Sequence, residues 1–145
     1  MKRNVIPYKP GHMDFLEPKK VFEGCDFTRI DEAAALPSSY AFTIINHNLP
    51  IAVVGITEFM PRVAEIWSVT SERVRECRLY FHKTCNDMID EHQKKLGLQR
   101  IQMTVEVGYD EGRDWALSLG FEQEGIMGKY DPVTGKSAFL FARTF

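Results

Sequence analysis

The sequence lacks a strong excess of charge of either sign, and it lacks a long apolar run. Its 145 residues include 18 Lys and Arg against 20 Asp and Glu, a formal net charge of -2 at pH 7. That balance gives no field that would hold nucleic acid nonspecifically or attract an anionic membrane. No apolar run approaches the roughly 20 residues of a membrane-spanning helix, and the N-terminus lacks the apolar core of a signal peptide. We therefore expect a soluble cytoplasmic protein that binds neither nucleic acid nor membrane.

Cysteine and metal-ligand patterns are also sparse. Cys25, Cys77 and Cys85 are odd in number and widely spaced, so we do not expect a disulfide framework. Cys77 and Cys85 lie eight residues apart in sequence on one face of a predicted helix, as small buried thiols do. The four histidines show no HExxH or paired-ligand spacing, and the sequence has no Cys-x-x-Cys. We therefore expect no structural or catalytic metal.

The length and the hydrophobic content of 44% suit one domain over residues 1–145. Two β-branched and aromatic runs, Tyr40–Asn46 and Ile51–Phe59, flank a turn-forming stretch and predict a hairpin. A third run, Val63–Val69, would complete an antiparallel meander. Gly55 inside the second run indicates a bulge or a close backbone approach. Three shorter elements are expected before these strands: an edge strand over Val5–Tyr8 and helices over His12–Phe22 and Asp31–Leu36.

The clearest periodic element is a long amphipathic helix from Val74 to Leu96. Apolar residues recur there at intervals of three and four, charged residues lie between them, and Gly97 can end the helix. The next run, Arg100–Val107, alternates apolar and polar residues as a half-buried strand does. Two strands joined through a helix of this length should be parallel, and we expect these two to separate beyond Val69. Two elements complete the chain: a short helix before Gly120, and a hairpin of Phe121–Tyr130 and Ala138–Phe145.

The order of these elements resembles that of the Gcn5-related acetyltransferase (GNAT) family. Strand, long helix, strand, short helix and Leu119-Gly120-Phe121 follow one another as they do around that family's acyl-CoA site. The resemblance implies an α+β fold: a GNAT-like mixed β-sheet with a central parallel strand pair and the long helix between the two strands. It also implies acetyl-CoA as the cofactor. By position, it implies that Val69, Thr70 and Ser71 face the pantetheine and that Arg73, Val74 and Arg75 approach the phosphates.

The chain departs from the family pattern where the chemistry would be. The family's phosphate loop is rich in glycine, but the stretch after the central strand contains none. Where family members have a tyrosine that protonates the departing thiolate, this chain has Ala116, so Tyr109 or Tyr130 would have to replace it. A general base must take a proton from the amine, and the candidates by position are Glu65 and Glu58. We name Glu65 and Tyr109 as the predicted catalytic pair.

The stretch from Trp67 to Val74 resembles a narrower group, the internal virion protein A family of short-tailed phages. This resemblance implies a degenerate acyl-CoA site and a role in virion assembly or as an internal virion component. Its partners would be phage virion or host proteins, in the host-cell cytoplasm or in the virion. A phage virion protein is therefore our first functional hypothesis. The alternative is an active N-acetyltransferase that moves acetyl from acetyl-CoA to an amine of a small molecule or protein, and a general ligand-binding module is a third.

Overall fold

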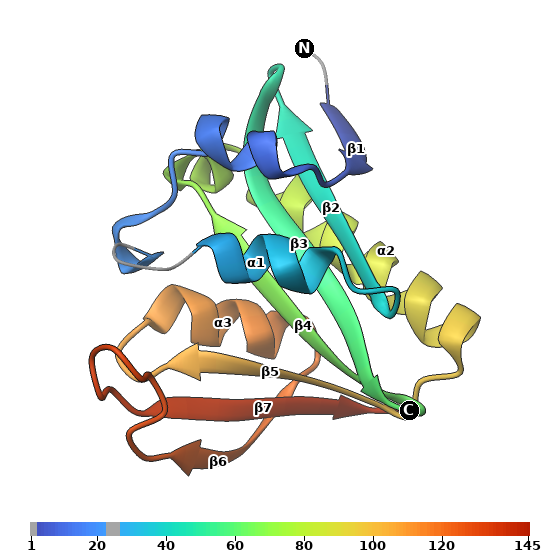
Figure 1. Ribbon diagram of the computed structural model, residues 1–145, viewed down its shortest axis with the longest axis vertical. Coiled ribbons are helices and arrows are strands. Elements are labelled where there is room, and N and C mark those ends of the chain that lie inside the picture. Colours follow the sequence, from blue (N-terminus) through green and yellow to red (C-terminus); the bar gives the residue numbers. More distant parts are fainter. Residues whose placement is uncertain (1–2, 23–26) are drawn as a thin grey trace.

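The computed structural model describes residues 3–22 and 27–145, so Cys25 lies outside the described residues. A seven-stranded mixed sheet has the order β1-β2-β3-β4-β5-β7-β6 (Figure 1). The strands are β1 (Arg3–Pro7), β2 (Ser39–Asn46), β3 (Leu49–Met60), β4 (Val63–Thr70), β5 (Arg100–Glu106), β6 (Glu122–Met127) and β7 (Ala138–Thr144). The helices are α1 (Phe27–Ala34), α2 (Arg78–Leu96) and α3 (Asp110–Ser118), with 3-10 segments η1 (Pro10–Phe15), η2 (Lys20–Phe22) and η3 (Glu72–Glu76). The predicted α+β fold with a parallel central pair is confirmed.

The N-terminal segment differs from the sequence prediction. Two short 3-10 segments replace the helix expected over His12–Phe22, because Glu17 has a φ of 50° and Pro18 follows it. Proline cannot donate a backbone hydrogen bond inside a helix. Pro18 instead pairs with Ser71 in an isolated antiparallel bridge. The segment therefore runs to the end of β4, where it contributes to the site described below.

Strands β1 to β4 are antiparallel and include the predicted meander and edge strand. Gly55 lies opposite Trp67, and a Cβ at Gly55 would meet the indole ring at 2.1 Å. The predicted bulge or backbone approach at Gly55 is therefore wrong: a side chain packs across the glycine, and the register shifts of β3 lie elsewhere. Helix α1, expected over Asp31–Leu36, begins earlier at Phe27 and ends at Ala34.

The long helix, expected from Val74, begins at Arg78 after η3. Ser71 caps η3, because its side-chain oxygen accepts a hydrogen bond from the Arg73 N–H at 3.3 Å. At the other end, Gly97 adopts the left-handed conformation (φ 61°) and closes the helix as predicted. The 3-10 segment therefore occupies the place where the first turn of an α-helix was expected.

Alternation along the strands creates an apolar core on each face of the sheet. The larger core lies against α2 and α3 and includes Ile66, Phe81 and Ile101. The smaller core lies against η1 and α1 and includes Val53 and Val69. Helices α1 and α2 accordingly cover opposite faces (Figure 1). Phe81 is 5% exposed, which confirms the predicted inner face of α2.

The predicted C-terminal hairpin is also present, because β7 pairs antiparallel with both β5 and β6. Of its expected inner aromatic residues, Phe141 is fully buried. Phe145 is 46% exposed, because it lies beyond the last residue of β7. Within residues 3–22 and 27–145, the helices are too short or too polar to cross a lipid bilayer.

Candidate functional site

The parallel strands β4 and β5 remain paired over only a short distance. Their register runs from Val63 and Arg100 to Glu65 and Gln102. Beyond that point β4 follows β3, whereas β5 stays paired with β7 along its whole length. The two strands are therefore drawn apart after Glu65, earlier than the separation beyond Val69 that the sequence suggested.

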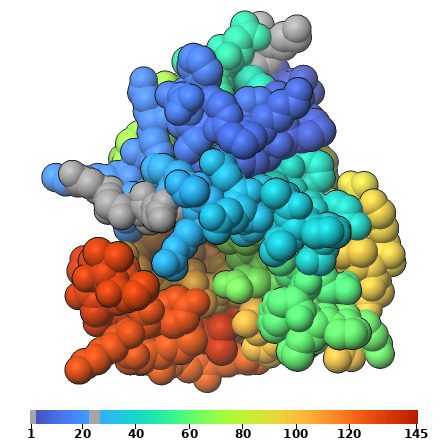
Figure 2. Space-filling view, viewed as in Figure 1, coloured from blue at the N-terminus to red at the C-terminus, as the bar shows by residue number. Residues whose placement is uncertain are grey.

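A cavity of about 1290 Å³ occupies the gap between the strands. Successive side chains on a strand point to opposite faces, so the cavity has a compartment on each side of the sheet. The compartment toward α2 and α3 is mostly apolar and is lined by Ile66, Phe81, Met103, Val105 and Trp115. The compartment toward α1 is more polar and is lined by Arg29, Glu65, Trp67, Thr104 and Glu106. Figure 2 shows the surface hollowed between α1 and the loop of residues 128–137.

Glu65 lies where the two strands part, on the face toward α1. Its side chain is half-buried, lines the cavity, and has no hydrogen-bond or ion-pair partner among the described residues. Burial raises the pKa of the Glu65 carboxyl above its ordinary value. A half-buried carboxylate without a fixed cation can accept a proton from a ligand. The other candidate base, Glu58, is not among the described residues that line the cavity.

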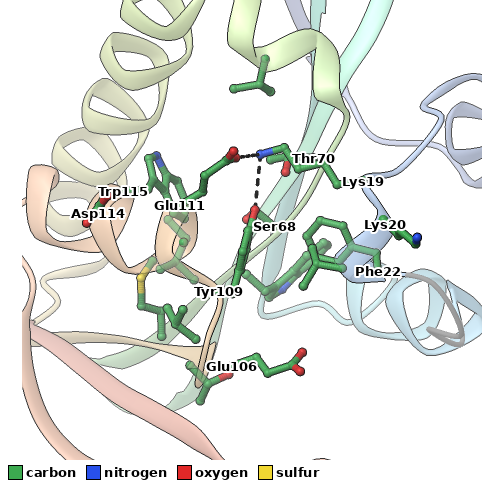
Figure 3. A pocket seen from close by; sticks show the side chains of 18 of the residues that line it. Lys19, Lys20, Phe22, Ser68, Thr70, Glu106, Tyr109, Glu111, Asp114 and Trp115 are labelled. Carbon is green, nitrogen blue, oxygen red and sulfur yellow. Dashed lines mark hydrogen bonds and ion pairs between the residues drawn. The ribbon is translucent and has the colours of Figure 1, made fainter.

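Tyr109 immediately precedes α3 and lines the same cavity. Its ring packs on Gly112, where a Cβ would meet the ring atom Cδ2 at 2.7 Å. Its hydroxyl oxygen accepts a hydrogen bond from Lys19 Nζ at 3.3 Å (Figure 3). Because the oxygen is the acceptor in that bond, the hydroxyl proton can be donated to a ligand.

The other two positions considered for a general acid are less suitable. Ala116 is fully buried in the larger core, so it is neither a donor nor a position with room for a tyrosine. Tyr130 is 49% exposed and borders a smaller hollow beside Pro132 and Lys136. Of the three positions, only Tyr109 places a hydroxyl in the cavity between β4 and β5.

Only some of the six residues implied to hold the cofactor line the cavity. Thr70, Val74 and Arg75 line the cavity. Val69 is instead buried in the smaller core on the opposite face. Ser71 is also buried, and its N–H donates to the Ile51 carbonyl of β3 at 2.9 Å.

Arg73 holds the N-terminal segment against the sheet. Its guanidinium donates to the carbonyl oxygens of Phe15 and Pro50, each at 2.9 Å, and pairs with Glu17 at 3.0 Å. The backbone amides of this region are also engaged, since Val74 N–H donates to the Ser71 carbonyl at 3.1 Å. That the cofactor phosphates lie at residues 71–75 stays a prediction. The Arg75 side chain lines the cavity and is better placed to contact them than the backbone amides, which are already hydrogen-bonded.

Sequence reasoning missed two residues, Lys19 and Glu111, which meet at the mouth of the cavity. Lys19 Nζ lies 2.6 Å from Glu111 Oε2 (Figure 3). The Arg75 guanidinium pairs with Glu111 Oε1. Hydrogen bonds from Lys19 and then Arg75 lower the pKa of Glu111 to about 2. We call Lys19, Arg75 and Glu111 together the rim clasp. No local motif marks them, because 91 residues lie between Lys19 and Glu111 in the chain.

The backbone of Lys19 also reaches the gap. Because the Ser71 N–H points toward β3, the polar groups of Thr70 point to the opposite edge of β4. There the Thr70 carbonyl accepts a hydrogen bond from the Lys19 N–H at 2.8 Å. By the same alternation, the backbone groups of Ser68 face the gap, beyond the end of the β4–β5 register.

Two buried polar atoms in the cavity lining lack a hydrogen-bond partner among the described residues, Thr70 Oγ1 and Trp115 Nε1. Buried polar atoms are usually paired, so each indicates room for a ligand atom or water. In the same part of the chain, His, Cys, Asp and Glu side chains form no group of three or more that could hold a metal ion.

The mixed sheet, its parted parallel strands and the helix between them define the fold of the Gcn5-related N-acetyltransferases. Solved structures with this fold include a chimera of the spermidine N-acetyltransferase SpeG from Vibrio cholerae and hSSAT. It is 14% identical, with a TM-score of 0.76, over 99% of this chain and 96% of that chain. SpeG from Vibrio cholerae with manganese ions is 14% identical, with a TM-score of 0.71, over 99% and 92%.

A third structure, provisionally described as an acetyltransferase, is 10% identical, with a TM-score of 0.80, over 98% of this chain and 85% of that chain. No protein-family model and no curated protein sequence matches the chain. At these identities the similarity establishes the fold alone. The comparisons give no support to the resemblance to internal virion protein A.

Proposed function

We propose that this protein is an N-acetyltransferase that moves acetyl from acetyl-CoA to an amine. The observation that carries the proposal is the early end of the β4–β5 register, which leaves a cavity beside the Glu65 carboxylate, for which the described part of the chain provides no partner. The acetyltransferase names of structures with the same fold support the same function. The alternative hypothesis from the sequence is therefore preferred over the virion role.

The residues present fit acetyl-CoA. The gap-facing backbone of Ser68 offers strand-like hydrogen bonds to an amide-containing arm, as an exposed sheet edge does to a peptide. Thr70 Oγ1 and Trp115 Nε1 are further polar atoms without partners among the described residues. Arg75, which lines the cavity, supplies positive charge for phosphates. When bound, acetyl-CoA would supply an acetyl group activated as a thioester.

Glu65 would act as the general base. An amine is mostly protonated at neutral pH and must lose a proton before it can attack a carbonyl carbon. The Glu65 carboxylate, in the compartment toward α1, can take that proton because no described residue pairs with it. Burial raises the pKa of Glu65, which makes it a stronger base than an ordinary carboxylate.

Tyr109 would act as the general acid. Its hydroxyl can give a proton to the sulfur of the departing thiolate, while the Lys19 ammonium next to it stabilises the negative charge left on oxygen. Gly112 fixes the ring by allowing it to pack on the first turn of α3. Lys19 and Gly112 are positioning residues in this scheme.

The acceptor is most simply a cationic amine. The compartment toward α1 contains the Glu65 carboxylate, which has no cation beside it among the described residues, whereas Glu106 there is already paired with Lys136 at 3.0 Å. Spermidine, named in the SpeG structures, is one such amine. An amine on a peptide lysine has the same chemistry, so both belong in the test.

A non-catalytic scaffold remains the second candidate, and one observation favours it. The amides of Ser71, Arg73 and Val74 are already hydrogen-bonded, so the glycine-loop cradle typical of the family has no equivalent in these three groups. A virion scaffold with a degenerate site, with phage or host proteins as partners, would bind acetyl-CoA weakly or not at all.

Calorimetric titration with acetyl-CoA and CoA separates the two candidates. We expect binding, followed by release of CoA thiol when spermidine or a lysine peptide is added. The titration should be repeated at raised salt, because contacts from exposed cations are screened. If neither ligand binds at millimolar concentration, the acetyltransferase proposal is wrong and the scaffold is favoured.

A further inference from the structure

The side of the cavity toward α1 has an apolar wall. Phe22, Ile30 and Trp67 are half-buried side chains that pack on the smaller core and also line the cavity. They come from η2, α1 and β4, which lie far apart in the sequence. The Phe22 ring extends the wall to Tyr109 through an edge-to-face contact, with ring centroids 6.4 Å apart (Figure 3). A molecule on this side of the sheet would therefore lie against apolar and aromatic side chains.

The indole of Trp67 is held in a fixed orientation within this wall. The ring packs over Gly55, where a Cβ would meet ring atom Cζ2 at 2.1 Å. Its Nε1–H donates a hydrogen bond to Thr57 Oγ1 at 3.2 Å, and Ser39 Oγ lies 2.8 Å from the same oxygen. Glu65 is two residues before Trp67 on the same face of β4, so the fixed ring is a neighbour of the proposed base.

The loop of residues 128–137 forms the opposite border of the opening (Figure 2). Pro132 and Val133 line the cavity from this loop, and the Val133 side chain is 81% exposed. An apolar ligand body would cover this valine and remove apolar surface from water, which favours binding. Apolar side chains are thus available on both borders of the opening.

Glu65 is the one carboxylate of the cavity lining without a partner among the described residues. Each of the other four is engaged. Their partners are Lys136 for Glu106 at 3.0 Å, Lys19 and Arg75 for Glu111, Arg113 for Asp114 at 3.8 Å, and the N–H groups of residues 133 and 134 for Asp131. The described lining therefore offers a single free carboxylate to an ammonium group.

The α1 side of the cavity, with η2 and the loop of residues 128–137, has no excess of negative charge among its described residues. Three carboxylates are matched by three cations, the first group being Glu65, Glu106 and Asp131 and the second Lys20, Arg29 and Lys136. A molecule with several ammonium groups would bring more positive charge than this side can neutralise. One ammonium, placed at Glu65, is the charge that it can accept.

We propose that the acceptor is a monoamine with an apolar body, best an aromatic one. Its ammonium lies at Glu65, and its body lies between the apolar wall and Val133. A largely apolar lining with one oriented polar group is typical of sites for small molecules. The inference rests on the proposed function for the reaction and narrows its acceptor. A polyamine such as spermidine would be a poor substrate.

The step is an aminolysis of the thioester. The amine nitrogen forms a bond to the acetyl carbon, and the carbon–sulfur bond breaks. The ammonium loses two protons to solvent through Glu65, whereas Tyr109 gives one proton to the sulfur and regains one from solvent. The net products are the N-acetyl amide, CoA thiol and one proton.

The test compares pentylamine with putrescine, which have the same chain length and differ only in a methyl group against a second ammonium. The rate of thiol release from acetyl-CoA is measured for each amine. We expect kcat/KM to be at least about tenfold higher for pentylamine, because a second ammonium would meet an apolar surface without a free carboxylate. Phenethylamine should be better still, since its ring can pack on Trp67, and spermidine should be no better than putrescine.

A first pair of variants tests the apolar contact. Val133→Ser should lower kcat/KM for pentylamine about threefold and leave that for putrescine unchanged, because the hydroxyl removes apolar surface from the border of the opening. Ile126→Ser is the matched control, since Ile126 is 63% exposed on β6 and is not among the described residues of the cavity. Both positions are exposed, so both variants should fold.

A second pair tests the charge balance. Arg29→Glu adds a carboxylate on the α1 side and should reduce the preference for pentylamine over putrescine about tenfold. Arg113→Glu is the control, because Arg113 is exposed on α3 and is not among the described cavity residues. Thermal unfolding shows whether each variant is intact. The same amine preference in both variants would mean that the acceptor does not lie beside α1, and would overturn the inference.

The outcomes separate this inference from the proposed function. If putrescine or spermidine is acetylated as well as pentylamine, the inference is wrong although acetyl transfer stands. A preference for L-phenylalanine over phenethylamine would also overturn it, because a cation would then be holding a carboxylate.

If no amine releases thiol, the acetyltransferase proposal fails and amine binding decides the inference. Binding is measured in the presence of CoA by intrinsic fluorescence, since Trp67 and Trp115 both line the cavity. Tighter binding of pentylamine than of putrescine would support a monoamine site in a protein without transferase activity. Equal binding of the two amines, or none, would overturn the inference.

Discussion

The two ends of the β4–β5 pair are held together by different forces. At the closed end, backbone pairing from Val63 to Glu65 is backed by side chains such as Ile101, which is fully buried. At the open end, the rim clasp joins the N-terminal segment and η3, which follows β4, to α3, which follows β5, and the Lys19 N–H donates to the Thr70 carbonyl of β4. Stability is thus concentrated where the strands touch, and the open end is left with contacts that a ligand can exchange. The comparison separates residues that hold the fold from residues that serve the site.

Glu65 lies at the boundary between the two ends, and its replacement should have the largest effect. Glu65→Gln keeps the shape but removes the base, so kcat/KM for acetyl transfer should fall about 10²–10⁴-fold. In wild type, kcat/KM should decline as the pH falls through the raised pKa of Glu65, and the variant should lose that dependence. A raised carboxyl pKa means that ionisation at neutral pH disfavours the fold, so the variant should be no less stable.

Glu58→Gln is the control for that experiment, because Glu58 lies on β3 and is not among the described residues of the cavity. A large loss of activity in Glu58→Gln together with normal activity in Glu65→Gln would show that we assigned the base to the wrong strand.

The closed end should dominate stability. Ile101→Ala removes a fully buried side chain where the strands pair and should lower the free energy of unfolding by about 2–5 kcal/mol. Ile126→Ala, at a position on β6 that is 63% exposed, should change it by less than about 0.5 kcal/mol. Urea unfolding measures both, and equal losses would contradict the stabilising role of the buried side chain at the closed end.

A smaller effect is expected at Gly112, which supports the open end. Gly112→Ala places a methyl group against the Tyr109 ring and should cost about 1–3 kcal/mol through overpacking. Activity should fall as well, because the ring must move. Gly125→Ala is the control, since a Cβ there has no atom within 4 Å among the described residues. The proposed packing fails its test if the two alanine variants have the same activity.

The smallest expected effect is the pH response of the rim clasp. The pKa of Glu111 is lowered from 4.5 to about 2, so its stabilising contribution is complete above about pH 4.5 and is lost as the pH falls toward 2. Because Glu111 is 39% exposed, we expect the contribution to stay below about 1 kcal/mol. The difference in urea midpoint between wild type and Glu111→Gln should therefore shrink between pH 6 and pH 2.5. A difference that grows in acid would exclude the assigned pairing.

Local patterns in the sequence were sufficient to predict most of the fold. The apolar spacing in α2 and the alternation in β5 depend on neighbouring residues, and the structure confirms both. The predicted start of α2 was wrong because Ser71 caps a 3-10 segment at that point. The position of Ser71 depends on its backbone hydrogen bond to β3, which lies far from it in the sequence. The point of strand separation was also misplaced, since it results from β7 pairing with β5.

The site was less predictable from sequence. Glu65 and Tyr109 could be named from their positions on predicted elements, and both line the cavity, although their catalytic roles remain predictions. Arg73 looked like a phosphate ligand because of its charge, but it is committed to Phe15, Glu17 and Pro50. Such a choice between partners depends on the fold of the distant N-terminal segment, which a local pattern does not contain.

The cavity reaches both faces of the sheet, and this has a consequence for the order of events in a reaction. Two molecules can be bound together, one against α1 and the other against α2 and α3, with their reactive atoms meeting between the strands. Transfer would then proceed within a ternary complex, and double-reciprocal plots of rate against each substrate would intersect. An acetyl-enzyme relay through a thiol would need a cysteine in the gap, but the thiols of Cys77 and Cys85 are both buried and are not among the described cavity residues. The geometry thus favours direct attack by the amine on the thioester.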